Sequence, residues 1–91
     1  MKIEYDPAKN ARNVRERGLS FERAAEFDFG TAFSGMEFRN GEMRVLAIGY
    51  LDRRLHVLCY RPIPDGIRVI SFRKANEREA KRYGKPKTLD R

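Results

Sequence analysis

The sequence predicts an α+β domain, in which two N-terminal helices pack on one face of an antiparallel sheet of about four strands and a short helix follows the last strand. Two observations favour this class. Capped helical segments fill the first thirty residues, and alternating apolar positions separated by short turns follow from residue 33 to residue 72. No repeat or interdomain linker interrupts the 91 residues, so we expect a single domain over residues 1–91.

The N-terminal region begins with a short alternating strand from Lys2 to Tyr5. Asp6-Pro7 ends this strand, because aspartate is a favourable N-cap and proline is favourable at the first helical position. The helix that follows ends at Gly18, because glycine readily adopts the left-handed conformation of a C-terminal cap. The expected apolar face of this helix is thin and consists of Ala8, Ala11 and Val14.

A second helix is expected to begin after Ser20, another favourable N-cap, and to end near Phe29-Gly30. The side chains that it directs toward the core are Phe21, Ala24 and Ala25. The pattern then alternates, and Asn40-Gly41 is a strong signal for a tight hairpin turn. The candidate strands are Phe33–Phe38, Met43–Tyr50, Arg54–Arg61 and Ile67–Phe72. Their short connections imply an antiparallel meander.

The last expected element is a short charged helix after residue 75. Asn76 followed three residues later by Glu79 has the pattern of a capping box, which marks a helix start. Gly84 and the proline two residues after it end the helix. The remaining segment, residues 84–91, is polar and is expected to form a flexible tail.

Composition limits the partners and cofactors that the chain is expected to use. The 20 Lys and Arg against 13 Asp and Glu give a formal charge of +7, which favours nucleic acid or an acidic protein as partner. A single Cys59, a single His56 and no ligand cluster predict no metal and no cofactor. The absence of a signal peptide or a long apolar run predicts a cytoplasmic protein without a membrane partner.

A set of short motifs recurs in a fixed order along most of the chain. Its members are Tyr5-Asp6-Pro7, Lys9, Asn13, Gly18-Leu19-Ser20-Phe21, Ala24, Ala25, Glu42-x-Arg44, Ile48-Gly49, Ile67-Arg68-Val69-Ile70-Ser71-x-Arg73-Lys74-Ala75, Glu79 and Tyr83. No single motif is diagnostic. The ordered set at these spacings, however, resembles the BrnT toxins of bacterial type II toxin-antitoxin systems.

The resemblance implies a RelE-like ribonuclease that cleaves RNA, inhibits translation and is neutralised by a cognate BrnA-like antitoxin. It also implies that the antitoxin binds DNA, so that operator DNA is a partner only indirectly. The chain departs from the family pattern at one position. Where the family commonly has Lys-His-Gly after the first helix, this sequence has Glu16-Arg17-Gly18.

RNA cleavage without a metal needs a base, an acid and cations that stabilise the charge on phosphorus. Arg73 and Lys74, at the end of the last strand, are the best candidates for these cations, because guanidinium and ammonium groups bind phosphate. The structural alternative is that Arg73 pairs with Glu77 or Glu79 and only holds the helix to the sheet.

Glu79 and Tyr83 lie one helical turn apart, so both side chains can face the same way. Glu79 is a candidate base if its pKa is raised, although the capping box alone also explains it. Tyr83 is a candidate for stacking on a base or for donating a proton. Packing of its ring against the helix and the sheet explains it equally well.

His56 shares a strand face with Arg54, and as the only histidine it is the natural group to titrate near neutral pH. A histidine within a strand is also often a half-buried packing residue. Arg53 and Arg54 sit at a turn from which either can reach phosphate, or where both are simply solvated.

A basic ridge on the last helix is expected from the helical spacing of Lys74, Arg78, Lys81, Arg82 and Lys85. Such a ridge can guide an RNA backbone or bind an acidic segment of the antitoxin. Two functions therefore remain open on residues alone. One is an endoribonuclease, and the other is a non-catalytic basic module that binds the antitoxin or nucleic acid.

Overall fold

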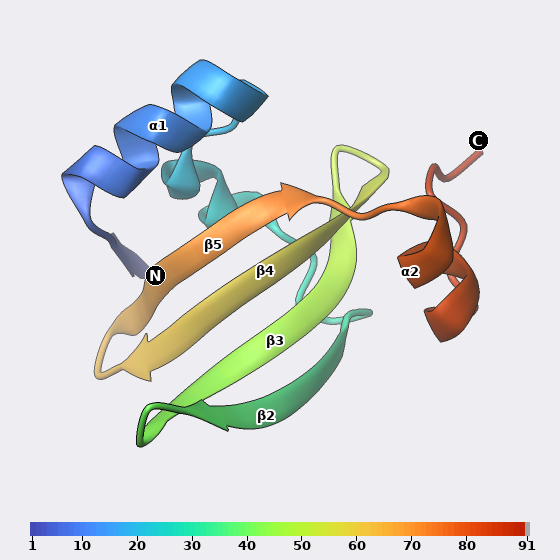
Figure 1. Ribbon diagram of the computed structural model, residues 1–91. Helices are drawn as coiled ribbons and strands as arrows, with labels where there is room; N and C mark the ends of the chain where they lie inside the picture. The colour runs from blue at the N-terminus through green and yellow to red at the C-terminus, as the bar shows by residue number, and fades with distance from the viewer. Residues whose placement is uncertain (91) are drawn as a thin grey trace.

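The computed structural model describes residues 1–90 and contains one five-stranded sheet with the order β1-β5-β4-β3-β2 (Figure 1). The strands are β1 (Lys2–Glu4), β2 (Phe33–Arg39), β3 (Glu42–Leu51), β4 (Arg54–Ile63) and β5 (Gly66–Lys74). The helices are α1 (Pro7–Arg17), the 3₁₀ helix η1 (Phe21–Glu26) and α2 (Glu77–Tyr83). The α+β class is confirmed.

The sheet differs from the expected antiparallel one of about four strands. Strand β1 pairs in parallel with β5, through Lys2 with Gly66 and Glu4 with Arg68, so the sheet is mixed and has five strands. This pairing requires close contact of the two backbones. Gly66 permits it, because a Cβ atom there would overlap the Lys2 carbonyl.

Two apolar cores lie on opposite faces of the sheet. The segment from Leu19 to Phe27, which includes η1, covers one face. It packs there against strand residues Ala47, Leu51, Leu58, Ile67, Val69 and Phe72. Helix α2 covers the other face through Ala80, against Ile48, Tyr50, Leu55, Val57 and Ala75. The expectation of two α-helices on one face was therefore wrong in detail, because η1 is a 3₁₀ helix and α1 lies mainly at an edge.

Helix α1 covers the part of the β5 edge that β1 leaves unpaired (Figure 1). Its contact is polar: the amide nitrogen of buried Asn13 donates to the Phe72 carbonyl at 3.0 Å and to the Leu19 carbonyl at 2.9 Å. The expected apolar face does not pack inward, since Ala8, Ala11 and Val14 are exposed. A helix that covers a sheet edge satisfies backbone groups there and needs little apolar surface.

A β-bulge in β5 decides which side chains face which side of the sheet. Cys59 of β4 pairs with Ser71, but the next residue, Tyr60, pairs with Val69, so Ile70 is the extra residue. Val69 and Phe72 consequently both face the η1 core, although they are three positions apart. Beyond the bulge, Lys74 pairs with His56.

The C-terminal segment, expected to be a flexible tail, makes hydrogen bonds with the β3–β4 turn and with the strand ends beside it. The Leu55 amide donates to the Lys87 carbonyl at 2.7 Å, and the Leu89 amide donates to the Arg53 carbonyl at 2.8 Å. The Tyr50 hydroxyl also donates to the Pro86 carbonyl at 2.8 Å. Within residues 1–90, no helix has the length and apolar character needed to cross a membrane.

Candidate functional site

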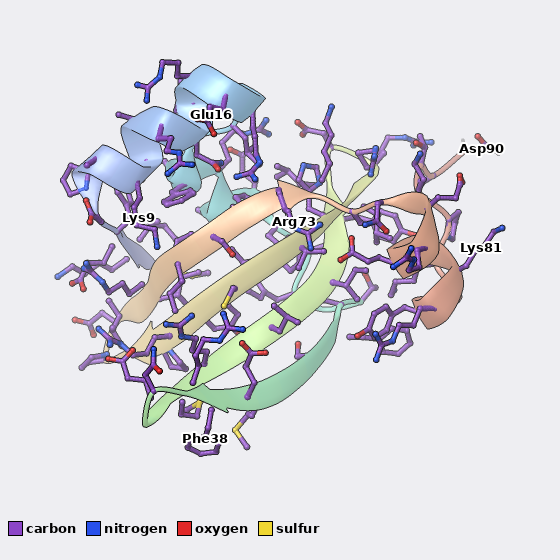
Figure 2. The ribbon with its side chains drawn as sticks, viewed as in Figure 1. Lys9, Glu16, Phe38, Arg73, Lys81 and Asp90 are labelled. Atoms are coloured by element: carbon purple, nitrogen blue, oxygen red, sulfur yellow. The ribbon has the colours of Figure 1, made fainter. Side chains whose placement is uncertain are left out.

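A cleft of about 670 Å³ opens where the end of α1, the β3–β4 turn, the start of β4 and the end of β5 meet. Its lining residues are Arg17, Gly18, Leu19, Arg23, Leu51, Asp52, Arg54, His56, Arg73 and Lys74. Five of them are basic and only one is acidic. Figure 2 shows Arg73 at the end of β5, between α1 and α2. The cleft therefore presents a strongly positive surface, which suits a polyanion.

His56 is buried, with 4% of its surface exposed, and its ring packs on Phe72 at a centroid distance of 5.4 Å. Its Nδ1 lies 2.7 Å from the Arg54 carbonyl oxygen. Because a carbonyl can only accept, Nδ1 carries the hydrogen in the neutral ring and Nε2 is left as an acceptor. Burial lowers the pKa of His56 below its ordinary value, despite the bond to Arg54. The ring is therefore an unprotonated base at neutral pH.

Arg54 holds the start of β4 against the end of β5. One terminal nitrogen donates to the Leu55 carbonyl at 2.7 Å and the other to the Ala75 carbonyl at 3.1 Å. Its charge has no carboxylate partner among residues 1–90. Arg54 therefore contributes both to the local structure and to the positive potential of the cleft.

Arg73 forms a two-bond ion pair with Glu79 of α2, with N–O distances of 2.9 and 2.7 Å. The bonds to Arg73 are the main cause that lowers the pKa of Glu79 to about 2. Glu79 also completes the capping box, accepting from the Asn76 amide at 2.9 Å while its own amide donates to Asn76 Oδ1 at 2.8 Å. A carboxylate with so low a pKa is a weak base.

Arg17 and Lys74 are the cations of the cleft whose charges are most available. Within residues 1–90 neither has a carboxylate partner. Arg17 is instead oriented by Asn13, whose Oδ1 accepts from Arg17 Nη1 at 2.7 Å. Arg23 differs, because it pairs with Asp52 and Glu26, each at 2.8 Å. Free phosphate-binding capacity therefore concentrates on Arg17 and Lys74.

The structure brings four of the predicted site residues together in the cleft: Arg54, His56, Arg73 and Lys74. It places Glu79, Arg82 and Tyr83 in a separate hollow between α2 and β2. Arg53 lies at the β3–β4 turn, where it donates to the Leu89 carbonyl at 2.6 Å. Arg78 and Lys81 are exposed on α2, and Figure 2 shows Lys81 at its outer side.

The expected basic ridge is shorter than the spacing suggested. Lys74 lies in β5 and faces the cleft, and Lys85 lies beyond the C-cap of α2, where it donates to the Thr31 carbonyl at 2.7 Å. Arg78, Lys81 and Arg82 remain on the helix itself. The spacing was helical, but the helix covers only residues 77–83.

Three charged lining residues are not among the site residues that the sequence predicts: Arg17, Arg23 and Asp52. In the sequence, Arg17 stands out only as a departure from a family pattern. Its position at the end of α1, next to the left-handed Gly18, is a local signal for the helix end but not for the cleft. Arg23 and Asp52 carry no such signal, since their proximity depends on tertiary packing.

Comparison with known proteins adds a family assignment to this geometry. A family model described as "Ribonuclease toxin, BrnT, of type II toxin-antitoxin system" matches residues 5–79. Among solved structures, the fold is similar to that of the Brucella abortus ribonuclease toxin BrnT, with 26% sequence identity and a TM-score of 0.65. The match covers 85% of this chain and 99% of that one. No match was found among curated proteins.

Proposed function

Because this chain belongs to the BrnT family of type II ribonuclease toxins, we propose that it is a metal-independent endoribonuclease that cleaves RNA in the basic cleft and so inhibits translation. The observation that carries this proposal is the placement of an unprotonated, tautomer-fixed His56 among cations that lack carboxylate partners. Such a set supplies the base and the charge stabilisation that phosphodiester cleavage requires.

In the proposed reaction, His56 Nε2 takes the proton of a 2′-hydroxyl while the 2′-oxygen attacks phosphorus. The bond from phosphorus to the 5′-oxygen then breaks, which leaves a 2′,3′-cyclic phosphate and a 5′-hydroxyl. Arg17 and Lys74 stabilise the additional negative charge on the phosphoryl oxygens. Lys74, the cross-strand partner of His56, is our candidate for protonating the leaving oxygen.

The departure at residue 17 fits this division of roles. An arginine remains protonated under all physiological conditions, so Arg17 cannot exchange a proton as a histidine at that position can. We therefore assign phosphate binding to Arg17, and we assign proton transfer to His56. Arg73, whose terminal nitrogens are engaged by Glu79, adds positive charge to the cleft wall in a fixed orientation.

The test is cleavage of RNA by the purified, antitoxin-free protein in excess EDTA. We expect cleavage to persist with the chelator, to end in 2′,3′-cyclic phosphates, and to fall by at least about a hundredfold in His56→Gln. Arg39→Gln is the matched control, because Arg39 is an exposed arginine on β2 outside the cleft. RNA that stays intact with the wild-type protein would overturn the proposal.

A non-catalytic binding module is the second candidate function. It is favoured by one observation, namely that carboxylates already pair with two of the five cleft cations, Arg23 and Arg73. In that case the protein would bind RNA or the antitoxin with the same residues and leave RNA intact. The cleavage assay separates the two functions directly.

Membership of a type II toxin family implies an antitoxin partner. We propose that it is a BrnA-like, DNA-binding protein, which makes operator DNA a partner only through the complex. The exposed cations of α2, Arg78, Lys81 and Arg82, suit an acidic antitoxin segment that reaches toward the cleft. An acidic peptide from the neighbouring reading frame should then protect RNA from cleavage.

A further inference from the structure

A second hollow, of about 240 Å³, lies between β2 and α2 on the sheet face that α2 covers. Its floor is mainly apolar, and its lining residues are Phe33, Ser34, Gly35, Leu46, Ala47, Ile48, Val57, Glu79, Arg82 and Tyr83. None of these residues is part of the cleavage step proposed above. The size and apolar floor suit one flat ring rather than a whole macromolecular segment.

Two exposed aromatic rings form one side of this hollow. Phe33 of β2 and Tyr83 of α2 have ring centroids 6.2 Å apart and planes inclined by 32°. Their exposed fractions are 53% and 37%, which is high for adjacent aromatic side chains above an apolar floor. Adjacent exposed rings above an apolar floor form contiguous apolar surface, which is a feature of binding sites.

Cations flank both rings. The Lys85 ammonium lies 4.8 Å from the Phe33 ring centroid, fixed by its bond to the Thr31 carbonyl, and the Arg82 guanidinium carbon lies 5.7 Å from the Tyr83 centroid. An apolar protein side chain gains nothing from these charges. An aromatic group that carries a phosphate gains from both the rings and the cations.

The hollow shares a wall with the basic cleft. Arg73 lines the cleft, Glu79 lines the hollow, and the two side chains form the ion pair that separates them. Val57, the cross-strand partner of Arg73, also lines the hollow. His56 packs on the η1-face core and Val57 belongs to the α2-face core, so a nucleotide chain with a phosphate in the cleft reaches the hollow by passing the Arg73–Glu79 pair, and the base that it places there lies further along the strand.

We propose that the Phe33–Tyr83 hollow is a base-binding subsite, so that the substrate is unpaired RNA with one base stacked on these rings. This inference rests on the proposed function, because the phosphate of the same strand occupies the cleft. Bases inside a duplex are stacked on each other and cannot enter a hollow. Stacking accepts every base, so the subsite selects for single strands more than for sequence.

The test measures binding with a short single-stranded 2′-O-methyl RNA, which has no 2′-hydroxyl to attack and so cannot be cleaved by this route. Its partner probe is a strand with the same phosphates and abasic sugars. We expect Phe33→Ala and Tyr83→Ala to weaken binding of the first probe by about tenfold each and to leave the abasic strand unaffected. Tyr83→Phe should bind as the wild type does, because it retains a ring.

Phe38→Ala is the matched control. Phe38 is also an exposed phenylalanine of β2, but it lies near the β2–β3 turn, at the other end of the sheet from Arg73 (Figure 2). We expect it to bind both probes normally. Thermal unfolding of all the variants separates loss of the fold from loss of the subsite.

Three results would overturn the subsite: equal losses with both probes, no loss in either ring variant, or a loss only in affinity for the antitoxin, which would make the hollow a protein-docking surface. Failure of the cleavage proposal is distinguishable. Base-dependent binding without RNA cleavage contradicts the endoribonuclease alone, and normal cleavage and binding by Phe33→Ala contradicts the subsite alone.

Discussion

His56 donates its Nδ1 hydrogen to the Arg54 carbonyl oxygen over 2.7 Å, and this one bond determines which ring nitrogen can act as a base. The backbone of the same strand therefore fixes the tautomer of the proposed base without a carboxylate behind it. Arg54 in turn is fixed by carbonyls at the start of β4 and the end of β5. The proposed base and a cation of the cleft are thus oriented together.

The first prediction concerns the pH dependence of cleavage. Burial lowers the pKa of His56, and the charges of Arg54 and Lys74 act in the same direction, so the base is lost only below its ordinary value of 6.5. We expect kcat/KM to stay level down to pH 6.5 and to fall at lower pH. An acidic limb centred above 6.5 would contradict this assignment.

The same shift predicts how folding stability depends on pH. The unfolded chain binds a proton on His56 near pH 6.5, whereas the folded chain binds it only at lower pH. The contribution of neutral His56 is therefore complete above pH 6.5 and is lost as the pH falls toward the folded pKa. We expect urea unfolding at pH 7.5 and 5.5 to show a smaller decrease for His56→Gln than for the wild type.

Arg17 should make a measurable contribution to phosphate binding. Arg17→Gln removes a charge that has no carboxylate partner among residues 1–90, so we expect weaker RNA binding at low salt. The slope of log affinity against log salt should become less steep by about 0.7 for a single-stranded probe. Arg39→Gln should change the slope little, and an unchanged slope in Arg17→Gln would remove Arg17 from the site.

Local signals predicted much of this fold. Gly18 as a left-handed cap and the capping box of Asn76 with Glu79 occur as expected, because each depends on residues only a few positions apart. The strands from residue 42 to residue 74 also follow from alternation and short turns. The features that were predicted wrongly depend on residues far apart in the sequence. Nothing in Lys2–Tyr5 indicates a parallel pairing with a strand more than sixty residues later.

The site was predictable to the extent that strand alternation holds. Alternation alone predicts that Arg54 and His56 share one face of their strand. The bulge at Ile70 then determines that Lys74, rather than Arg73, pairs with His56. Val69 and Phe72, apolar but three positions apart, were a signal for that bulge. The contribution of Arg17 depends on how α1 packs at the β5 edge, for which no local pattern exists.

Asn13 connects α1 to the rest of the site, which predicts a stability effect. Asn13→Asp keeps the acceptor for Arg17 but loses both donors, leaving the Leu19 and Phe72 carbonyls facing a buried carboxylate. We expect a loss of about 1–3 kcal/mol in the free energy of unfolding. Arg12→Ala, which removes an exposed pair with Glu16 on the same helix, should cost less than about 1 kcal/mol. Equal costs would contradict the role of Asn13.

The last prediction separates two roles of the Arg73–Glu79 pair. Arg73→Gln and Glu79→Gln both break the two-bond contact, so each should reduce stability at pH 7 by about 1 kcal/mol, the partial exposure of Arg73 limiting the effect. Their effects on RNA should be opposite, because Arg73→Gln removes a cation of the cleft and Glu79→Gln releases it from its partner. We expect weaker RNA binding in the first and binding at least as tight as that of the wild type in the second.

The pH dependence of the stability that Glu79 contributes follows from its pKa, which folding lowers from 4.5 to about 2. Its contribution is complete above pH 4.5 and disappears as the pH falls toward 2, so the stability difference between wild type and Glu79→Gln should shrink over that range in acid unfolding. A difference that stays constant from pH 7 to pH 2 would show that the capping bonds, and not the ion pair, account for the effect of Glu79.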